Sequence, residues 1–297
     1  MFNKTVRKMS DGWQKNYLEG MEQVVDRYKQ LNDVEYIPDV PFESQDNVTL
    51  AMDIFRPWNA GKESLPVVLM VHGGGLLMGD RHMEMGICRN FAKAGFLSVS
   101  IEYRVFPESD IKGAVLDLAG GMEYIGRNAS RYGGDADRIY LVCESAGVFA
   151  SIFALSMIRS ETVRKAFGGR SPDINIRAMA AQSGMFYVRR KDIVGMVMSG
   201  NVIPTRWGNR DFLKILDTEQ EEILNSIPPV FLVSSKGDFL RKYTLKYSDF
   251  LKNNKKEYRL IYYDKAGHLP HAFCSLAPEL PESIEVGKMI VSWFLEH

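Results

Sequence analysis

Ser145 stands where a strand-like segment meets a helical one, a position that suits a nucleophile. Residues 139–143 before it are apolar, and residues 146–159 after it have a helical pattern. A serine in a G-x-S-x-G turn of this kind presents its hydroxyl at the end of a sheet. Cys143 replaces the first glycine of that pattern here, while Gly147 supplies the second. The alternative that Ser145 only caps the following helix stays open.

An acid and a base for this hydroxyl can be found late in the chain. A serine becomes nucleophilic when a histidine accepts its proton, and a carboxylate must orient that histidine. Asp238 follows the apolar run at residues 228–235, whereas its rival Asp264 ends the next run, where the histidine loop should begin. Two histidines follow, His268 and His271, and the shorter spacing from Asp238 favours His268. A metal site at His268-x-x-His271 lacks a third ligand nearby.

Three consecutive glycines follow His72 at the end of the apolar run 66–71. Glycine lets a backbone come close to a reacting group, with no side chain in the way. Negative charge on an attacked carbonyl oxygen is met by backbone N–H groups, and losing one such donor costs about 3–4 kcal/mol of barrier. The candidate donors are the amides of Gly74, Gly75 and Ala146. A phosphate-binding loop is excluded because neither of its glycine patterns is present.

The elements around these residues predict an α/β fold. Short apolar runs alternate with helical patterns through most of the chain, which indicates a parallel sheet covered on both faces. Residues 1–33 have helical spacing, and residues 185–227 interrupt the alternation for longer than a connection requires. We therefore expect a core at 34–184 and 228–297, a cap or lid insertion at 185–227, and an N-terminal helical segment at 1–33 that contributes to the cap.

Composition narrows the function classes. The chain has 297 residues, of which 45% are hydrophobic, and no net formal charge. The neutral charge balance argues against a nucleic-acid partner. Its longest apolar runs are far short of the roughly 20 residues that a membrane-spanning helix needs. Three cysteines without paired spacing, and the lack of a signal-peptide pattern, favour a cytoplasmic location. We expect a small-molecule substrate, no cofactor, no bound metal and a possible homodimer.

Four stretches, in order, resemble the hormone-sensitive-lipase-like branch of the α/β-hydrolases. They are HGGG at 72–75, YRVFPES at 103–109, CESAG at 143–147 and SSKGDFL at 234–240. The resemblance extends from about residue 66 to the C-terminus. It implies an α/β-hydrolase fold with an eight-stranded, mostly parallel sheet, flanking helices and a helical cap. It also implies that His72 is structural and that Arg104 and Glu108 are buried polar partners.

The resemblance also decides between the two late histidines. Members of this branch commonly have a histidine, any residue and then a phenylalanine at this point, which His271-Ala272-Phe273 matches. We therefore predict a serine hydrolase of short-chain carboxylic esters with Ser145, His271 and Asp238 as catalytic residues. Gly74, Gly75 and Ala146 form the predicted oxyanion hole. The alternatives are a non-catalytic small-ligand receptor on the same fold and an amidase or other acyl hydrolase.

Overall fold

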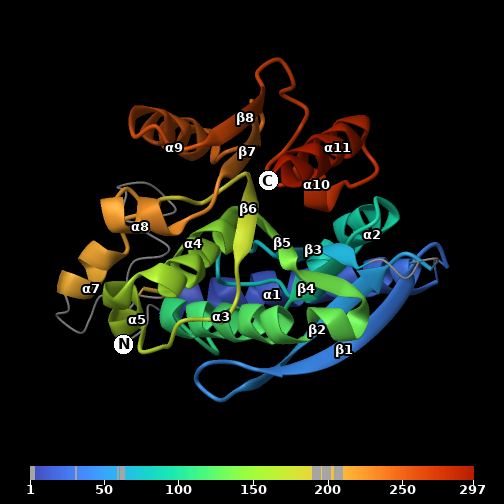
Figure 1. Ribbon diagram of the computed structural model, residues 1–297. Coiled ribbons are helices and arrows are strands. Elements are labelled where there is room, and N and C mark those ends of the chain that lie inside the picture. Colours follow the sequence, from blue (N-terminus) through green and yellow to red (C-terminus); the bar gives the residue numbers. More distant parts are fainter. Residues whose placement is uncertain are drawn as a thin grey trace.

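One eight-stranded sheet organises the chain in the computed structural model, which describes residues 4–30, 32–58, 60, 64–188, 195, 202–203 and 210–297. Its strand order is β1-β2-β4-β3-β5-β6-β7-β8 (Figure 1). The first strand pairs antiparallel with the second, and the second antiparallel with the fourth, whereas every other pairing is parallel. The expected mostly parallel α/β sheet is therefore confirmed. The strands are β1 (Glu35–Glu43), β2 (Thr49–Arg56), β3 (Leu65–Val71), β4 (Leu97–Ile101), β5 (Gly134–Glu144), β6 (Ile176–Gln182), β7 (Val230–Ser235) and β8 (Tyr258–Tyr263).

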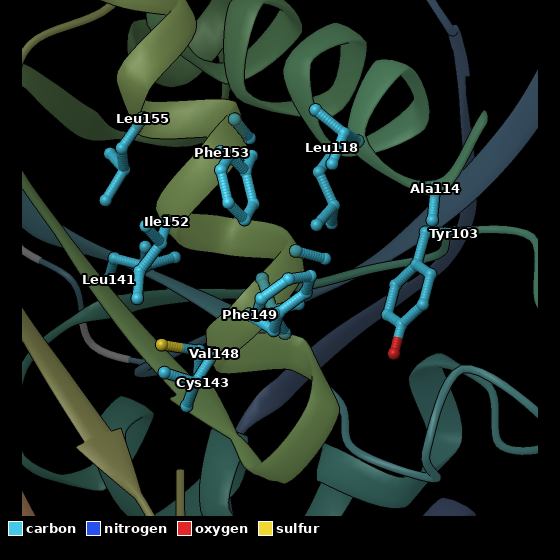
Figure 2. Packing of buried hydrophobic residues seen from close by; sticks show 14 of the residues in the cluster. Tyr103, Ala114, Leu118, Leu141, Cys143, Val148, Phe149, Ile152, Phe153 and Leu155 are labelled. Atoms are coloured by element: carbon cyan, nitrogen blue, oxygen red, sulfur yellow. The ribbon is translucent and has the colours of Figure 1, made fainter. Parts of the chain in front are cut away.

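Helices cover both faces of this sheet and bury a separate apolar cluster on each. One cluster contains α3, α4 and α9, and the other contains α2, α10 and α11. Figure 2 shows Phe149 and Phe153 of α4 directed toward α3, whose Leu118 faces them. Strands buried on both faces read as continuous apolar runs, which is why the sequence pattern identified them. The helices are α1 (Lys4–Lys29), η1 (Arg81–Glu84), α2 (Met85–Lys93), α3 (Ile111–Asn128), η2 (Ala129–Tyr132), α4 (Ser145–Arg159), α5 (Glu161–Phe167), α7 (Arg210–Ile215), α8 (Glu221–Ser226), α9 (Arg241–Asn253), α10 (Phe273–Leu276) and α11 (Pro281–Glu296).

The junction of β5 and α4 brings a helix against the end of β3. A methyl group at Gly147 would lie 2.3 Å from the carbonyl oxygen of His72 and 2.7 Å from that of Val71, so position 147 accepts no side chain. Cys143 fits at the other end of the turn because its buried thiol donates to the carbonyl oxygen of Ala180 on β6, at 3.5 Å. The neighbouring strand offers small alanines there, which leaves room for a sulfur atom.

The YRVFPES segment supports the glycine loop from beside it. The Tyr103 hydroxyl donates to the carbonyl oxygens of His72 and Gly73 at 2.9 and 3.0 Å, and its ring stacks on the His72 imidazole. Arg104 contacts the fully buried Asp117 through Nε and Nη2 at 2.9 and 2.7 Å. The expectation that Glu108 is also a buried partner was wrong, because Glu108 is exposed. It follows Pro107 in a turn at the surface, where a carboxylate stays hydrated.

The predicted cap is only partly visible. Residues 189–194, 196–201 and 204–209, the centre of the expected insertion 185–227, lie outside the described residues. Within the described part, α7 contacts α5 and α8 contacts α4. The N-terminal α1 lies against the segment that follows the glycine loop, since Tyr17 donates to Asp80 Oδ1 at 2.8 Å and Gln14 accepts from the Gly79 amide at 3.1 Å. The division into core and cap stays a prediction.

Replacing Arg104 with methionine should destabilise the fold. The buried Asp117 carboxylate would lose its guanidinium partner, and breaking a buried pair from one side costs about 3 kcal/mol or more. Chemical denaturation should therefore report a lower free energy of unfolding. Arg127→Met is the matched control, because Arg127 is 57% exposed and its partner Glu123 keeps a second cation, Arg170, at 2.6 Å. Equal losses in the two variants would contradict this role for Arg104.

Candidate active site

A continuous chain of hydrogen bonds joins the three residues predicted to act together. The Nε2 atom of His271 lies 2.8 Å from Ser145 Oγ, and its Nδ1 atom lies 2.7 Å from Asp238 Oδ1. These side chains come from the β5–α4 junction, the turn after β7 and the loop after β8. All three elements end at the carboxyl edge of the parallel strands, where ligands of open α/β sheets bind.

Ser145 occupies a strained backbone conformation at the first residue of α4. Its φ angle is +47°, in the left-handed region that non-glycine residues rarely adopt. Such a conformation costs of order 1 kcal/mol or more and persists only where the surroundings impose it. Here the helix, the strand and the backbone contact at Gly147 impose it. The strained turn directs the hydroxyl toward His271 instead of into the sheet.

Asp238 is fully buried and hydrogen-bonded as a carboxylate. Besides His271, its oxygens accept from Ser234 Oγ at 2.7 Å and from the Leu240 amide at 2.8 Å. Burial by itself raises the pKa of this carboxyl. The hydrogen bond and charge of His271, with the bonds from Ser234 and Leu240, outweigh burial and bring the pKa below its ordinary value. The group is therefore ionised and able to hold an imidazolium ion beside it.

The loop that carries His271 is tied to two neighbouring strand ends. The Ala272 amide donates to Ser183 Oγ at 3.0 Å, just after β6. Ser235 Oγ donates to the Leu269 carbonyl oxygen at 2.7 Å, and Gly237 pairs with Pro270 as an isolated bridge. The imidazole is thus positioned by backbone contacts as well as by its two ring bonds.

The competing histidine points elsewhere. His268 is 70% exposed, and its Nε2 atom lies 3.5 Å from Glu282 Oε1 on α11. The structure therefore brings His271, and not His268, to Ser145 and Asp238. Spacing from Asp238 favoured His268, whereas the His-x-Phe resemblance pointed to His271; both histidines lie in one loop, and its folded path decides which ring turns inward.

The glycine loop lies directly beside the serine. A methyl group at Gly73 would come within 3.0 Å of Ser145 Cβ and 2.6 Å of Glu144 Oε1. Gly74 and Gly75 follow with φ angles of +88° and +68°. Ala146 is the second residue of α4, so its N–H is among the first four that no helical carbonyl satisfies. The loop and the helix start thus meet at Ser145, while the role of these amides stays a prediction.

Two buried glutamates lie behind this junction. Glu84 accepts from Ser275 Oγ at 3.0 Å, and Glu144 packs against Gly73. Burial raises the pKa of Glu84 to about 7, although the Ser275 hydrogen bond lowers it in part. Burial and the charge of Glu84 raise the pKa of Glu144 well above its ordinary value. The raised pKa values favour the neutral forms of these carboxyls and so reduce the negative charge near Ser145.

A family model matches more than half the length of the chain. The model of the BD-FAE family matches residues 52–237, which include the glycine loop and the Ser145 turn. The chain belongs to the BD-FAE family. The match ends one residue before Asp238, so the predicted acid and base of this BD-FAE family member lie beyond it.

Named sequence relatives match shorter segments of this chain. A probable isoprenylcysteine alpha-carbonyl methylesterase of Oryza sativa subsp. japonica is 33% identical over 120 residues, 40% of this chain and 28% of the relative. Carboxylesterase NlhH of Mycobacterium tuberculosis is 34% identical over 87 residues, 29% of this chain and 27% of the relative. The match thus spans little more than a quarter of each of these two relatives.

The solved structures show the α/β-hydrolase fold of this BD-FAE family member over almost its entire length. Esterase B from Lactobacillus rhamnosis, inhibited by a tributyrin phosphonate, superposes with a TM-score of 0.81 at 19% identity, covering 99% of this chain and 96% of that one. The esterase of Pyrobaculum calidifontis gives a TM-score of 0.74 at 19% identity, covering 99% and 97%.

Sequence reasoning missed the serines that hold Asp238 and the loop of His271. Ser234 donates to Asp238, and Ser183 accepts from the amide that follows His271. The available signal was the presence of short hydroxyl side chains where buried apolar strands end. Such residues have many structural uses, so the pattern alone could not assign them.

Among the described residues, no helix is long and apolar enough to cross a membrane. A cytoplasmic location and a homodimer both stay predictions.

Glu84→Gln should flatten part of the pH dependence of stability. The folded chain holds the Glu84 proton more tightly than the unfolded chain, whose glutamate has a pKa of about 4.3. The wild-type free energy of unfolding should therefore fall as the pH rises from that value to about 7. Urea unfolding across this range should give a shallower slope for the variant. Glu161→Gln, at an exposed position, should keep the wild-type slope. An unchanged slope in Glu84→Gln would contradict the raised pKa of Glu84.

Proposed function

We propose that this protein is a serine hydrolase that cleaves carboxylic esters. The observation that carries the proposal is the hydrogen-bond chain from Ser145 Oγ through His271 to the buried Asp238. Nucleophile, base and orienting acid follow in the chain order serine, aspartate, histidine, which is the order of α/β-hydrolases. The strained φ angle of Ser145 supports a reactive instead of a capping role.

The proposed reaction proceeds in two halves. Ser145 Oγ attacks the ester carbonyl carbon while His271 Nε2 accepts its proton, and the carbonyl oxygen becomes negatively charged. The amides of Gly74, Gly75 and Ala146 then hold that oxygen. The tetrahedral intermediate collapses, and His271 gives the proton to the departing alcohol oxygen. Water attacks the acyl-serine with the same base, which releases the carboxylic acid and restores Ser145.

Relatives support the ester class, and the acyl preference is part of the proposal. The relatives with matching segments include a methylesterase and a carboxylesterase, as their names state. The resemblance to the hormone-sensitive-lipase-like enzymes favours short acyl chains. We therefore expect hydrolysis to be faster with acetate and butyrate esters than with long-chain esters. An amidase would instead turn over the matched amide as fast as the ester.

Ser145→Ala should abolish ester hydrolysis. Removing the nucleophile of such a triad lowers kcat by at least about 10⁴-fold. The assay is steady-state hydrolysis of a chromogenic acetate ester. In addition, a fluorophosphonate should label Ser145 in the wild type, as mass spectrometry of the digested protein would show. A receptor on the same fold would give neither turnover nor labelling, and full activity in Ser145→Ala would remove the nucleophile assignment.

The two histidines provide a matched pair of variants. His271→Ala should lower kcat by at least about 10³-fold, because Ser145 loses its base. His268→Ala should stay within about twofold of wild type, because the exposed ring touches neither Ser145 nor Asp238. Both are measured with the same acetate ester. Loss of activity in His268→Ala with activity retained in His271→Ala would reverse the assignment of the base.

A further inference from the structure

Phe239 is an exposed aromatic side chain beside the proposed base. It directly follows Asp238, and its ring lies against the His271 imidazole with 4.2 Å between ring centroids. Its side chain is 66% exposed, the largest exposed fraction among the large exposed apolar side chains of the described residues. The preceding Asp238 and the following Leu240 are both buried. Phe239 therefore adds little to the core, and its exposure calls for another explanation.

The chemistry of ester cleavage determines what must approach this ring. In the first half of the proposed reaction, His271 Nε2 gives its proton to the departing alcohol oxygen. That oxygen must come within hydrogen-bond reach of Nε2, about 2.6–3.2 Å. The acyl carbon is meanwhile bonded to Ser145 Oγ. The groups attached to the alcohol oxygen must therefore extend along the side of the site where His271 and Phe239 lie.

We propose that Phe239 is the alcohol-side contact of this site and favours esters whose alcohol carries a flat apolar group, such as an aryl or benzyl group. The inference rests on the proposed ester hydrolysis and adds the substrate class on the alcohol side. Two aromatic rings in contact gain about 0.5–1.5 kcal/mol beyond the burial of their area. An exposed ring is ready for this contact without rearrangement of the core.

The test varies the alcohol while the acyl group stays constant. Benzyl acetate and ethyl acetate share the acetyl group, and their alcohols have similar acidity. Phe239→Ala should lower kcat/KM for benzyl acetate about tenfold, since it removes the ring contact and its buried area. The same variant should change kcat/KM for ethyl acetate by no more than about twofold. Phe239→Tyr keeps the ring and should retain most of the activity on benzyl acetate.

Controls separate this role from a general loss of activity. Leu295→Ala removes an apolar side chain that is 61% exposed near the end of α11, and should leave both substrates unaffected. Ethyl hexanoate differs from ethyl acetate only on the acyl side. Phe239→Ala should therefore change kcat/KM for the two ethyl esters by the same small factor. Fluorophosphonate labelling of Ser145 in Phe239→Ala reports whether the nucleophile and base are still in place.

The outcomes divide cleanly between the two proposals. A loss confined to benzyl acetate supports the alcohol-side assignment. Equal losses on all three esters, or a loss that follows the acyl chain, would overturn it even though Ser145→Ala is inactive. Full hydrolysis by Ser145→Ala would instead overturn the proposed function itself. Unchanged kcat/KM for benzyl acetate in Phe239→Ala would also overturn the inference.

Discussion

The turn at Ser145 is the constraint on which the site depends. A β-strand and an α-helix meet there with no intervening residue, which forces Ser145 to a φ angle of +47°. The helix must then pass so close to the end of β3 that position 147 accepts only glycine. These contacts involve the centre of the sheet. The free energy gained by packing there exceeds the cost of the strained backbone conformation at Ser145. Every other element of the site is arranged around this fixed hydroxyl.

Electrostatics divides the carboxyl groups around Ser145 into two kinds. Asp238 is buried but receives several hydrogen bonds, so its pKa is lowered and it remains charged. Glu84 and Glu144 are buried with fewer donors, so their pKa values are raised. The difference is one of hydrogen bonding and of the neighbouring charge, since all three are shielded from water. Negative charge is thereby kept beside the imidazole and reduced behind the glycine loop.

The predicted base is positioned by a network that spans the ends of β6 and β7. Hydroxyl groups of Ser183, Ser234 and Ser235 each bond to the segments that carry Asp238 or His271. Short side chains suit this task, because they lose little rotamer freedom and reach only one nearby polar group. Phe239 completes the surroundings of the imidazole on its exposed side. The site is therefore built from rigid strand ends, with one aromatic side chain left open to the solvent.

The sequence by itself determined which segments form buried strands and where the turn at Ser145 lies, because these follow from patterns of neighbouring residue types. Continuous apolar runs identified the buried strands, and the residue types at 143–147 indicated the strained turn. It also placed Asp238 and a histidine loop after the correct strands. Tertiary structure decided what depends on the folded path of a loop: that His271 and not His268 faces Ser145, and that Glu108 is exposed. Such choices rest on contacts between residues far apart in sequence: spacing favoured His268, and only the His-x-Phe pattern of the resembled family pointed to His271.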